Sequence, residues 1–135
     1  MRVLWLCSYA PYPPDFGGAR RTYNLLVQAA DAGHEVDLLA FATGDQALDG
    51  AAMDALGRLC RMVDLVADPA ALPAALGGED AAAVVRKRRG QLRSLASSRP
   101  YQYFAHCSAR MQAAVNRHAA ATAYDLVHVE ASQMG

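Results

Sequence analysis

The stretch Arg2-Val-Leu-Trp-Leu-Cys-Ser8 is a continuous run of mostly large apolar residues near the start of the chain. A run without apolar–polar alternation is typical of a strand that is covered on both faces in a parallel sheet. Apolar residues then recur at helical spacing, which predicts a helix over residues 19–32 that ends at Gly33. Glu35-Val-Asp-Leu-Leu-Ala-Phe41 predicts a second strand. Strand, helix and strand in this order form a βαβ unit, whose crossover is right-handed.

The rest of the chain continues this alternation. Helices are predicted over residues 49–60, 79–97 and 108–121, and strands over residues 62–67 and 124–130. We therefore expect one Rossmann-like α/β domain over residues 1–135, with a doubly wound, mainly parallel sheet of about four strands and flanking helices. The last strand stands close to the end of the sequence, which would leave an exposed edge. We expect a truncated domain, or one that a second copy or a further segment completes.

Composition narrows the class of protein. The chain has 135 residues, of which 53% are hydrophobic and 19% charged, so a packed core is expected rather than disorder. Its formal net charge is +0, which gives no indication of a nucleic-acid partner. The first apolar run is too short for a signal peptide or a membrane span, and a cytoplasmic location is expected.

The cysteines and histidines do not form a metal-binding pattern. Cys7, Cys60 and Cys107 are far apart and include no Cys-x-x-Cys pair, so we expect free, mostly buried thiols and no metal site. We expect His118 to face solvent on a polar side of its helix. His128 lies within the predicted last strand, where a buried core histidine and a site residue are both open interpretations.

The loop over residues 9–18 is the first place to look for chemistry, because doubly wound sheets bind ligands beyond the carboxyl ends of their strands. Gly17 and Gly18 precede the predicted helix, and paired glycines let a ligand approach the backbone closely. The free amides and dipole of a helix start favour a phosphate, and Arg20 and Arg21 add positive charge. Neither the dinucleotide fingerprint nor a Walker loop is present. A plain loop-to-helix turn is the alternative interpretation.

Several segments, taken in order, resemble the N-terminal domain of family 4 glycosyltransferases of the GT-B fold. The resemblance implies the acceptor-side domain of an enzyme that moves a sugar from a nucleotide-diphosphate donor to a glycan or lipid-linked acceptor, with retention of configuration. It implies no metal and no cofactor besides the nucleotide sugar as co-substrate. The segments are Val3-Leu-Trp-Leu6, Pro11-Tyr-Pro-Pro14, Gly17-Gly18, Arg21, Leu25-Leu26, Gly33-His-Glu-Val36 and Tyr124-Asp-Leu-Val-His-Val-Glu130.

The resemblance also implies roles for single residues. Gly17 and Gly18 would approach the donor diphosphate, and Arg21 would support that loop or touch the phosphate. His128 matches the first histidine of a His-x-His-like segment, and Glu130 replaces the second, active-site-facing one. Glu130 would then bind a hydroxyl of the acceptor or of the sugar, and both residues are candidate catalytic residues. Because the family's donor-domain carboxylate motif is absent here, nucleotide sugars are expected to bind weakly or not at all.

Other interpretations remain open. The basic residues Arg86, Lys87, Arg88 and Arg89 would contact anionic lipid headgroups at the inner face of the membrane, or would form an ordinary solvated helix face. A non-catalytic binding module or homo-oligomer is the main alternative function. A different α/β enzyme, such as a flavodoxin-like protein, would need a hydroxyl-rich phosphate cradle that the first loop lacks.

Overall fold

The computed structural model describes residues 1–42, 50–67, 85, 88–89, 91–92 and 108–130. Four strands form one sheet in which every neighbouring pair is parallel, in the order β3-β2-β1-β4. The strands are β1 (Arg2–Cys7), β2 (Glu35–Phe41), β3 (Met62–Val66) and β4 (Leu126–Glu130), and the flanking helices are α1 (Gly17–Asp31), α2 (Gly50–Gly57) and α5 (Ala109–Ala121).

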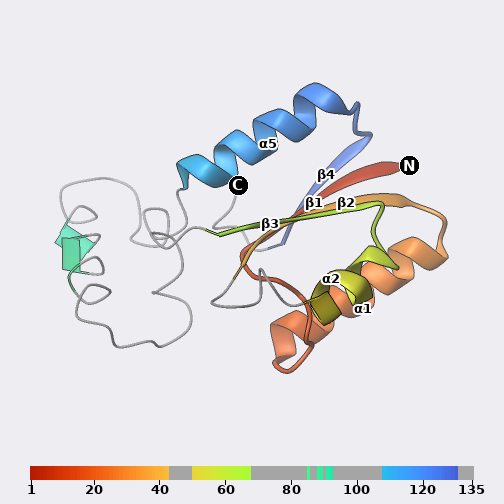
Figure 1. Cartoon of the computed structure of the whole chain (residues 1–135), viewed down its shortest axis with the longest axis horizontal. Coiled ribbons are helices and arrows are strands. Elements are labelled where there is room, and N and C mark those ends of the chain that lie inside the picture. The colour runs from red at the N-terminus through yellow and green to blue at the C-terminus, as the bar shows by residue number, and fades with distance from the viewer. Residues whose placement is uncertain (43–49, 68–84, 86–87, 90, 93–107, 131–135) are drawn as a thin grey trace.

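The helices cover both faces of the sheet. In Figure 1, α1 and α2 lie on one side of the strands and α5 lies on the other. Each face has its own apolar core, because alternate residues of a strand point to opposite faces. Trp5 packs with Leu26 and Leu56 on the α1 side, whereas Leu4 packs with Met111 on the α5 side. The predicted Rossmann-like, doubly wound α/β fold with a parallel four-stranded sheet is therefore confirmed.

Most predicted elements agree with the structure to within a few residues. One difference matters for the site, because α1 begins at Gly17, so that both glycines lie in its first turn and not before it. The amide of Arg20 donates to the carbonyl of Phe16 at 2.9 Å, which starts the helical ladder two residues earlier than predicted. Gly33 ends the helix region in the left-handed conformation, with φ of 76°, where glycine is favoured.

Part of the predicted pattern lies outside the described residues. Of the predicted helix over residues 79–97, the structure describes only residues 85, 88–89 and 91–92, whose side chains are exposed. Arg86, Lys87 and Cys107 lie outside the described residues. No helix in the described part of the chain is both long and apolar enough to cross a membrane.

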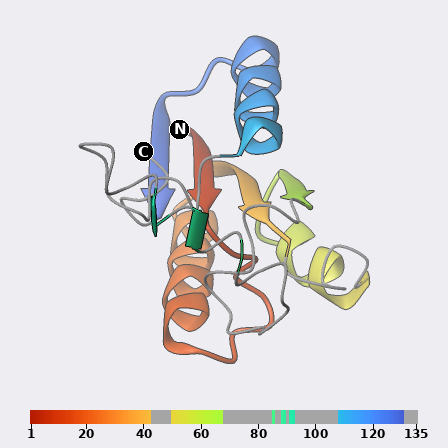
Figure 2. The same ribbon diagram turned by 90° about the vertical axis from the view of Figure 1, so that its left-hand side faces the viewer.

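The strands β1 and β4 position the candidate site. Figure 2 shows them side by side, with arrowheads directed toward the end of the molecule at which α1 begins. In their parallel register Trp5 pairs with His128, and Cys7 pairs with Glu130. Since Trp5 and Cys7 belong to the core on the α1 side, their strand neighbours His128 and Glu130 share that face.

Candidate functional site

Three of the predicted site residues meet at the carboxyl end of β4. Arg21, on α1, forms an ion pair and hydrogen bond through Nη1 with Oε1 of Glu130, although the two residues are 109 positions apart. His128 Nε2 lies 3.2 Å from the other oxygen of the same carboxylate, Oε2. Glu130 therefore bridges an arginine from the helix and a histidine from its own strand.

The three side chains differ in their access to solvent. The side chain of Glu130 is 7% exposed, while those of Arg21 and His128 are 67% and 35% exposed. A buried carboxylate needs compensating partners, and here both oxygens have one. The guanidinium carries five N–H donors, so Arg21 can bind an anion while Nη1 stays on Glu130. The guanidinium of Arg21 and the imidazole of His128 are therefore accessible to solvent, and both are held by the buried carboxylate of Glu130.

The orientation of His128 is suited to proton transfer. When Nε2–H donates to the Glu130 carboxylate, Nδ1 keeps the lone pair of the neutral ring. A carboxylate that orients an imidazole in this way is the arrangement used by general bases in many unrelated enzymes. Within this cluster His128 is therefore the group that can accept a proton from a bound hydroxyl.

Cys7 lies next to this cluster but is not a nucleophile. Burial raises the pKa of the Cys7 thiol, and the negative charge of Glu130 raises that pKa further. The thiol therefore stays protonated at neutral pH, and only the thiolate attacks. Cys7 and Cys60 are both free and buried, which confirms the sequence prediction for these two cysteines.

The glycine pair has two different explanations. A Cβ atom on Gly18 would lie 2.8 Å from the hydroxyl of Tyr9 and 3.1 Å from the ring of Phe16. A side chain at position 18 would therefore displace Tyr9 or Phe16, so packing favours glycine there without any ligand. A Cβ on Gly17 would meet nothing within 4 Å, and the backbone there is not left-handed. Within the described residues, neither packing nor backbone conformation requires a glycine at position 17.

The start of α1 has no side-chain cap. Phe16, the N-cap residue, makes no side-chain capping bond, and the first turn contains no acidic residue. The first amides of a helix have no carbonyl partner within the helix, and the helix dipole makes this end positive. Arg20 ends this first turn, where a cation is unfavourable, and Arg21 follows it and is already paired with Glu130. The uncapped turn and the exposed guanidinium of Arg21, which is paired with Glu130, are the two features here that could bind an anion.

A second polar cluster, which was not predicted from the sequence, lies on the opposite face of the sheet. Asp37 on β2 is fully buried, and its Oδ2 accepts hydrogen bonds from Arg61 and from the hydroxyl of Tyr124, the latter at 2.6 Å. On the neighbouring strand, Asp64 lies 3.0 Å from Nε2 of His118. Burial raises the pKa of the Tyr124 hydroxyl, and its hydrogen bond to Asp37 raises that pKa further.

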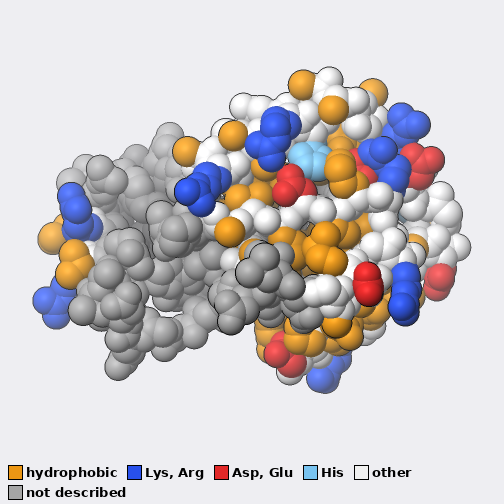
Figure 3. All heavy atoms as spheres, viewed as in Figure 1, with side chains coloured by type: hydrophobic (Ala, Val, Ile, Leu, Met, Phe, Trp, Pro, Cys, Tyr) orange, Lys and Arg blue, Asp and Glu red, His pale blue; other side chains and the backbone are white. Residues whose placement is uncertain are grey.

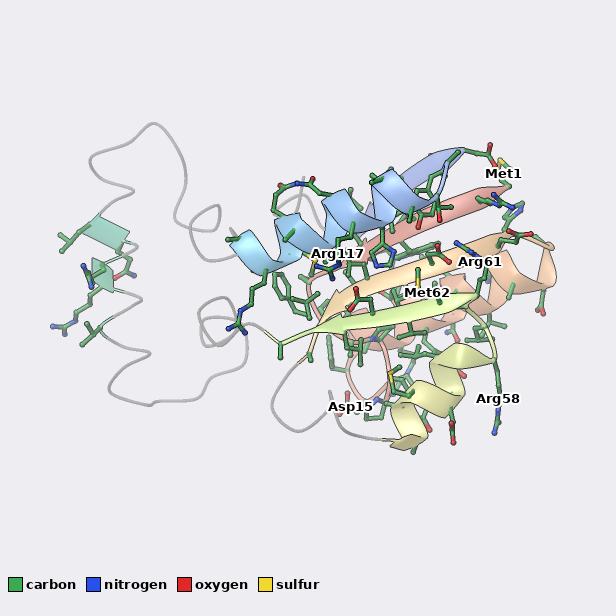
Figure 4. All side chains as sticks on the ribbon, turned by 45° about the horizontal axis from the view of Figure 1, so that its top comes forward. Met1, Asp15, Arg58, Arg61, Met62 and Arg117 are labelled. Carbon is green, nitrogen blue, oxygen red and sulfur yellow. The ribbon has the colours of Figure 1, made fainter. Side chains whose placement is uncertain are left out.

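This second cluster joins α5 to the sheet. Figure 4 labels Arg117 on α5 and Arg61 just before β3, and Figure 3 shows acidic and basic side chains mixed around a histidine on the side of the molecule drawn there. The expectation that His118 faces solvent is wrong, since only 6% of it is exposed. Its position seven residues after Met111 places it on the buried stripe of α5, a spacing that the sequence already contained.

The comparisons with known proteins add no assignment: no protein-family model, curated protein or solved structure matches the chain. In the described part of the chain, no group of three or more His, Cys, Asp or Glu residues is arranged to hold a metal ion.

Proposed function

We propose that this α/β domain is the acceptor-side domain of a glycosyltransferase that uses a nucleotide-diphosphate sugar and retains the configuration of the transferred sugar. The observation that carries the proposal is the meeting of Arg21, Glu130 and His128 beside the uncapped start of α1. The resemblance suggested each residue separately, whereas their contact is a property of the fold.

In this proposal the start of α1 binds the donor diphosphate. The amides of Gly17 and Gly18 and the exposed guanidinium of Arg21 face the negative charge that develops on the leaving diphosphate. Such donors are effective because they are already oriented before the reaction. The open space at Gly17 allows a phosphate oxygen to approach the backbone closely.

His128 and Glu130 serve the acceptor side of the reaction. His128 binds the acceptor hydroxyl through Nδ1 on the face of the sugar from which the diphosphate leaves, as retention requires. It takes the hydroxyl proton while the bond from the sugar C1 to the diphosphate oxygen breaks and the glycosidic bond forms. Glu130 keeps the imidazole and Arg21 in place and balances the positive charge that forms on His128. A lipid-linked acceptor would be met at the cytoplasmic face of a membrane, where the exposed Arg88 and Arg89 favour contact with anionic headgroups.

Substitution of Arg21 tests the diphosphate site. Inorganic pyrophosphate is titrated into the chain, and its affinity is compared between the wild type and Arg21→Gln. We expect weak, saturable binding that Arg21→Gln lowers roughly 3- to 10-fold, since a charge-assisted hydrogen bond at a partly exposed site is worth about 1 kcal/mol.

Arg20→Gln is the matched control, because Arg20 is the adjacent exposed arginine and its loss changes net charge by the same amount. This variant should lose less affinity than Arg21→Gln. If both variants lose the same affinity for pyrophosphate, the effect comes from net charge alone, which would contradict a specific role for Arg21.

A second candidate function is a binding or oligomerisation module without catalysis. Strand β4 favours it, since it stands at the edge among the described strands and its residues Leu126 and Val127 are 48% and 51% exposed. An uncovered strand edge with apolar side chains is a common pairing surface. This candidate requires no anion at Arg21, so the pyrophosphate titration separates the two functions.

A further inference from the structure

Trp5 supports one face of His128. The two ring centroids are 3.9 Å apart, and the ring planes are tilted by 36°. Trp5 is only 6% exposed and belongs to the apolar core on the α1 side, together with Leu26 and Val36. Its indole is therefore held firmly on one side, while its other contact is a partly exposed imidazole of the site.

The hydrogen bond to Glu130 does not fix the imidazole by itself. One bond at 3.2 Å sets the position of Nε2, but the ring can still turn about that contact, because the second torsion of histidine is broad. Contact with the indole face restricts that rotation. The two contacts together define the ring plane and the direction of Nδ1.

We propose that Trp5 is a positioning residue that holds His128 in the orientation in which Nε2–H donates to Glu130 and Nδ1 faces the acceptor. That this orientation serves catalysis rests on the proposed function. The physical arrangement does not depend on that function and follows from the tilted ring contact and the hydrogen bond. Sites whose reacting groups are held by a packed second layer keep the geometry that the chemistry requires.

Ring signals of His128 in nuclear magnetic resonance spectra test the arrangement without any ligand. In the wild type, ring protons over an indole are shifted upfield, and the ring nitrogens should report hydrogen on Nε2. Trp5→Leu should remove the upfield shift and mix the two tautomers. Trp5→Phe keeps an aromatic face and should retain the single tautomer, which gives rescue by the conservative variant.

Leu6→Ala controls for general destabilisation. Leu6 is equally buried on the same strand but faces α5, so its truncation destabilises the domain without touching His128. It should leave the His128 signals unchanged. If Trp5→Leu fails to fold, through-space contacts between the indole and His128 protons in the wild type still decide the matter, and their absence would overturn the proposal.

The result is distinguishable from a failure of the proposed function. If His128 keeps its wild-type tautomer in folded Trp5→Leu, Trp5 is not a positioning residue, and the pyrophosphate result still stands. Conversely, absence of pyrophosphate binding with a Trp5-dependent tautomer would remove the transferase proposal and leave Trp5 as the support of His128.

Discussion

Gly17 and Gly18 are adjacent and identical, yet the structure gives a packing reason for glycine only at position 18. Gly18 faces the hydroxyl of Tyr9, which also lies 3.2 Å from the hydroxyl of Thr22 in the core. A side chain at position 18 would displace Tyr9 and break that contact. Gly17 faces open space at the positive end of α1. The proposed ligand supplies a reason for glycine at position 17 that the described residues do not.

Alanine substitution should separate the two glycines. Gly18→Ala should lower the free energy of unfolding by roughly 1–2 kcal/mol through overpacking. Gly17→Ala should leave it unchanged or raise it by up to about 1 kcal/mol, because alanine restricts the unfolded chain. Pyrophosphate affinity should nevertheless fall in Gly17→Ala. Urea denaturation measures the first quantity, and a Gly17→Ala variant as unstable as Gly18→Ala would show that position 17 is also a packing site.

At the scale of elements, α5 is held to the sheet by polar contacts as well as by its apolar stripe. The Tyr124 hydroxyl, just beyond α5, donates to Asp37 on β2, and His118 on α5 contacts Asp64 on β3. Asp37 Oδ1 is buried without a hydrogen-bond partner among the described residues, so the carboxylate depends on its Oδ2 contacts. Removal of a donor to a buried charge is more costly than loss of an exposed hydrogen bond.

Tyr124→Phe should therefore destabilise the protein by about 1–3 kcal/mol. Tyr23→Phe is the matched control, since the Tyr23 hydroxyl makes no hydrogen bond to the described residues and its loss should change stability by less than about 0.5 kcal/mol. Chemical denaturation of both variants gives the comparison. Equal stabilities would mean that Asp37 does not need the Tyr124 hydroxyl.

The elements were predictable because their patterns are local. The apolar runs of β1 and β2 and the helical spacing of α1 each lie within one short stretch of sequence. The pairing of Asp37 with Tyr124 spans 87 residues and depends on how α5 returns the chain to the sheet. The resemblance indicated Arg21 and Glu130, but no local pattern could indicate that they touch. An acidic residue inside each of two apolar strands was the available sign of the second cluster.

At the scale of the whole molecule, the buried thiols make the free energy of unfolding depend on pH in the alkaline range. Burial raises the pKa of Cys60 from 9.0 to about 12, and burial also raises the pKa of Cys7. Below pH 9 both thiols are neutral in the folded and unfolded states, so their contribution to stability is fully present. Above pH 9 the unfolded thiols lose protons while the folded ones keep them. Stability is therefore lost as pH rises toward the folded pKa values.

The free energy of unfolding should decline above pH 9 by as much as about 1.4 kcal/mol per pH unit for each buried thiol. Cys60→Ala should remove one such contribution and make the decline shallower, even though the variant starts from a lower stability at neutral pH. Urea unfolding under reducing conditions between pH 7.5 and 10.5 measures the slopes. Parallel slopes in wild type and Cys60→Ala would contradict an ionisation cost at Cys60.

The two polar clusters have different roles: one holds elements together, and the other is the candidate ligand site. The Asp37 cluster lies under α5, where it holds elements together, and the Glu130 cluster lies on the α1 face at the carboxyl ends of β1 and β4. Ligand sites of doubly wound sheets occur at that end. The central claim is that an anion binds at the start of α1, within reach of Arg21.

A residue-resolved titration of the wild-type chain with pyrophosphate, followed by amide resonance positions, tests this claim most directly. Saturable changes should centre on the amides of Gly17, Gly18 and Ala19 and on the side chain of Arg21. Changes centred instead on the arginines of α5, or the absence of any saturable change, would contradict it.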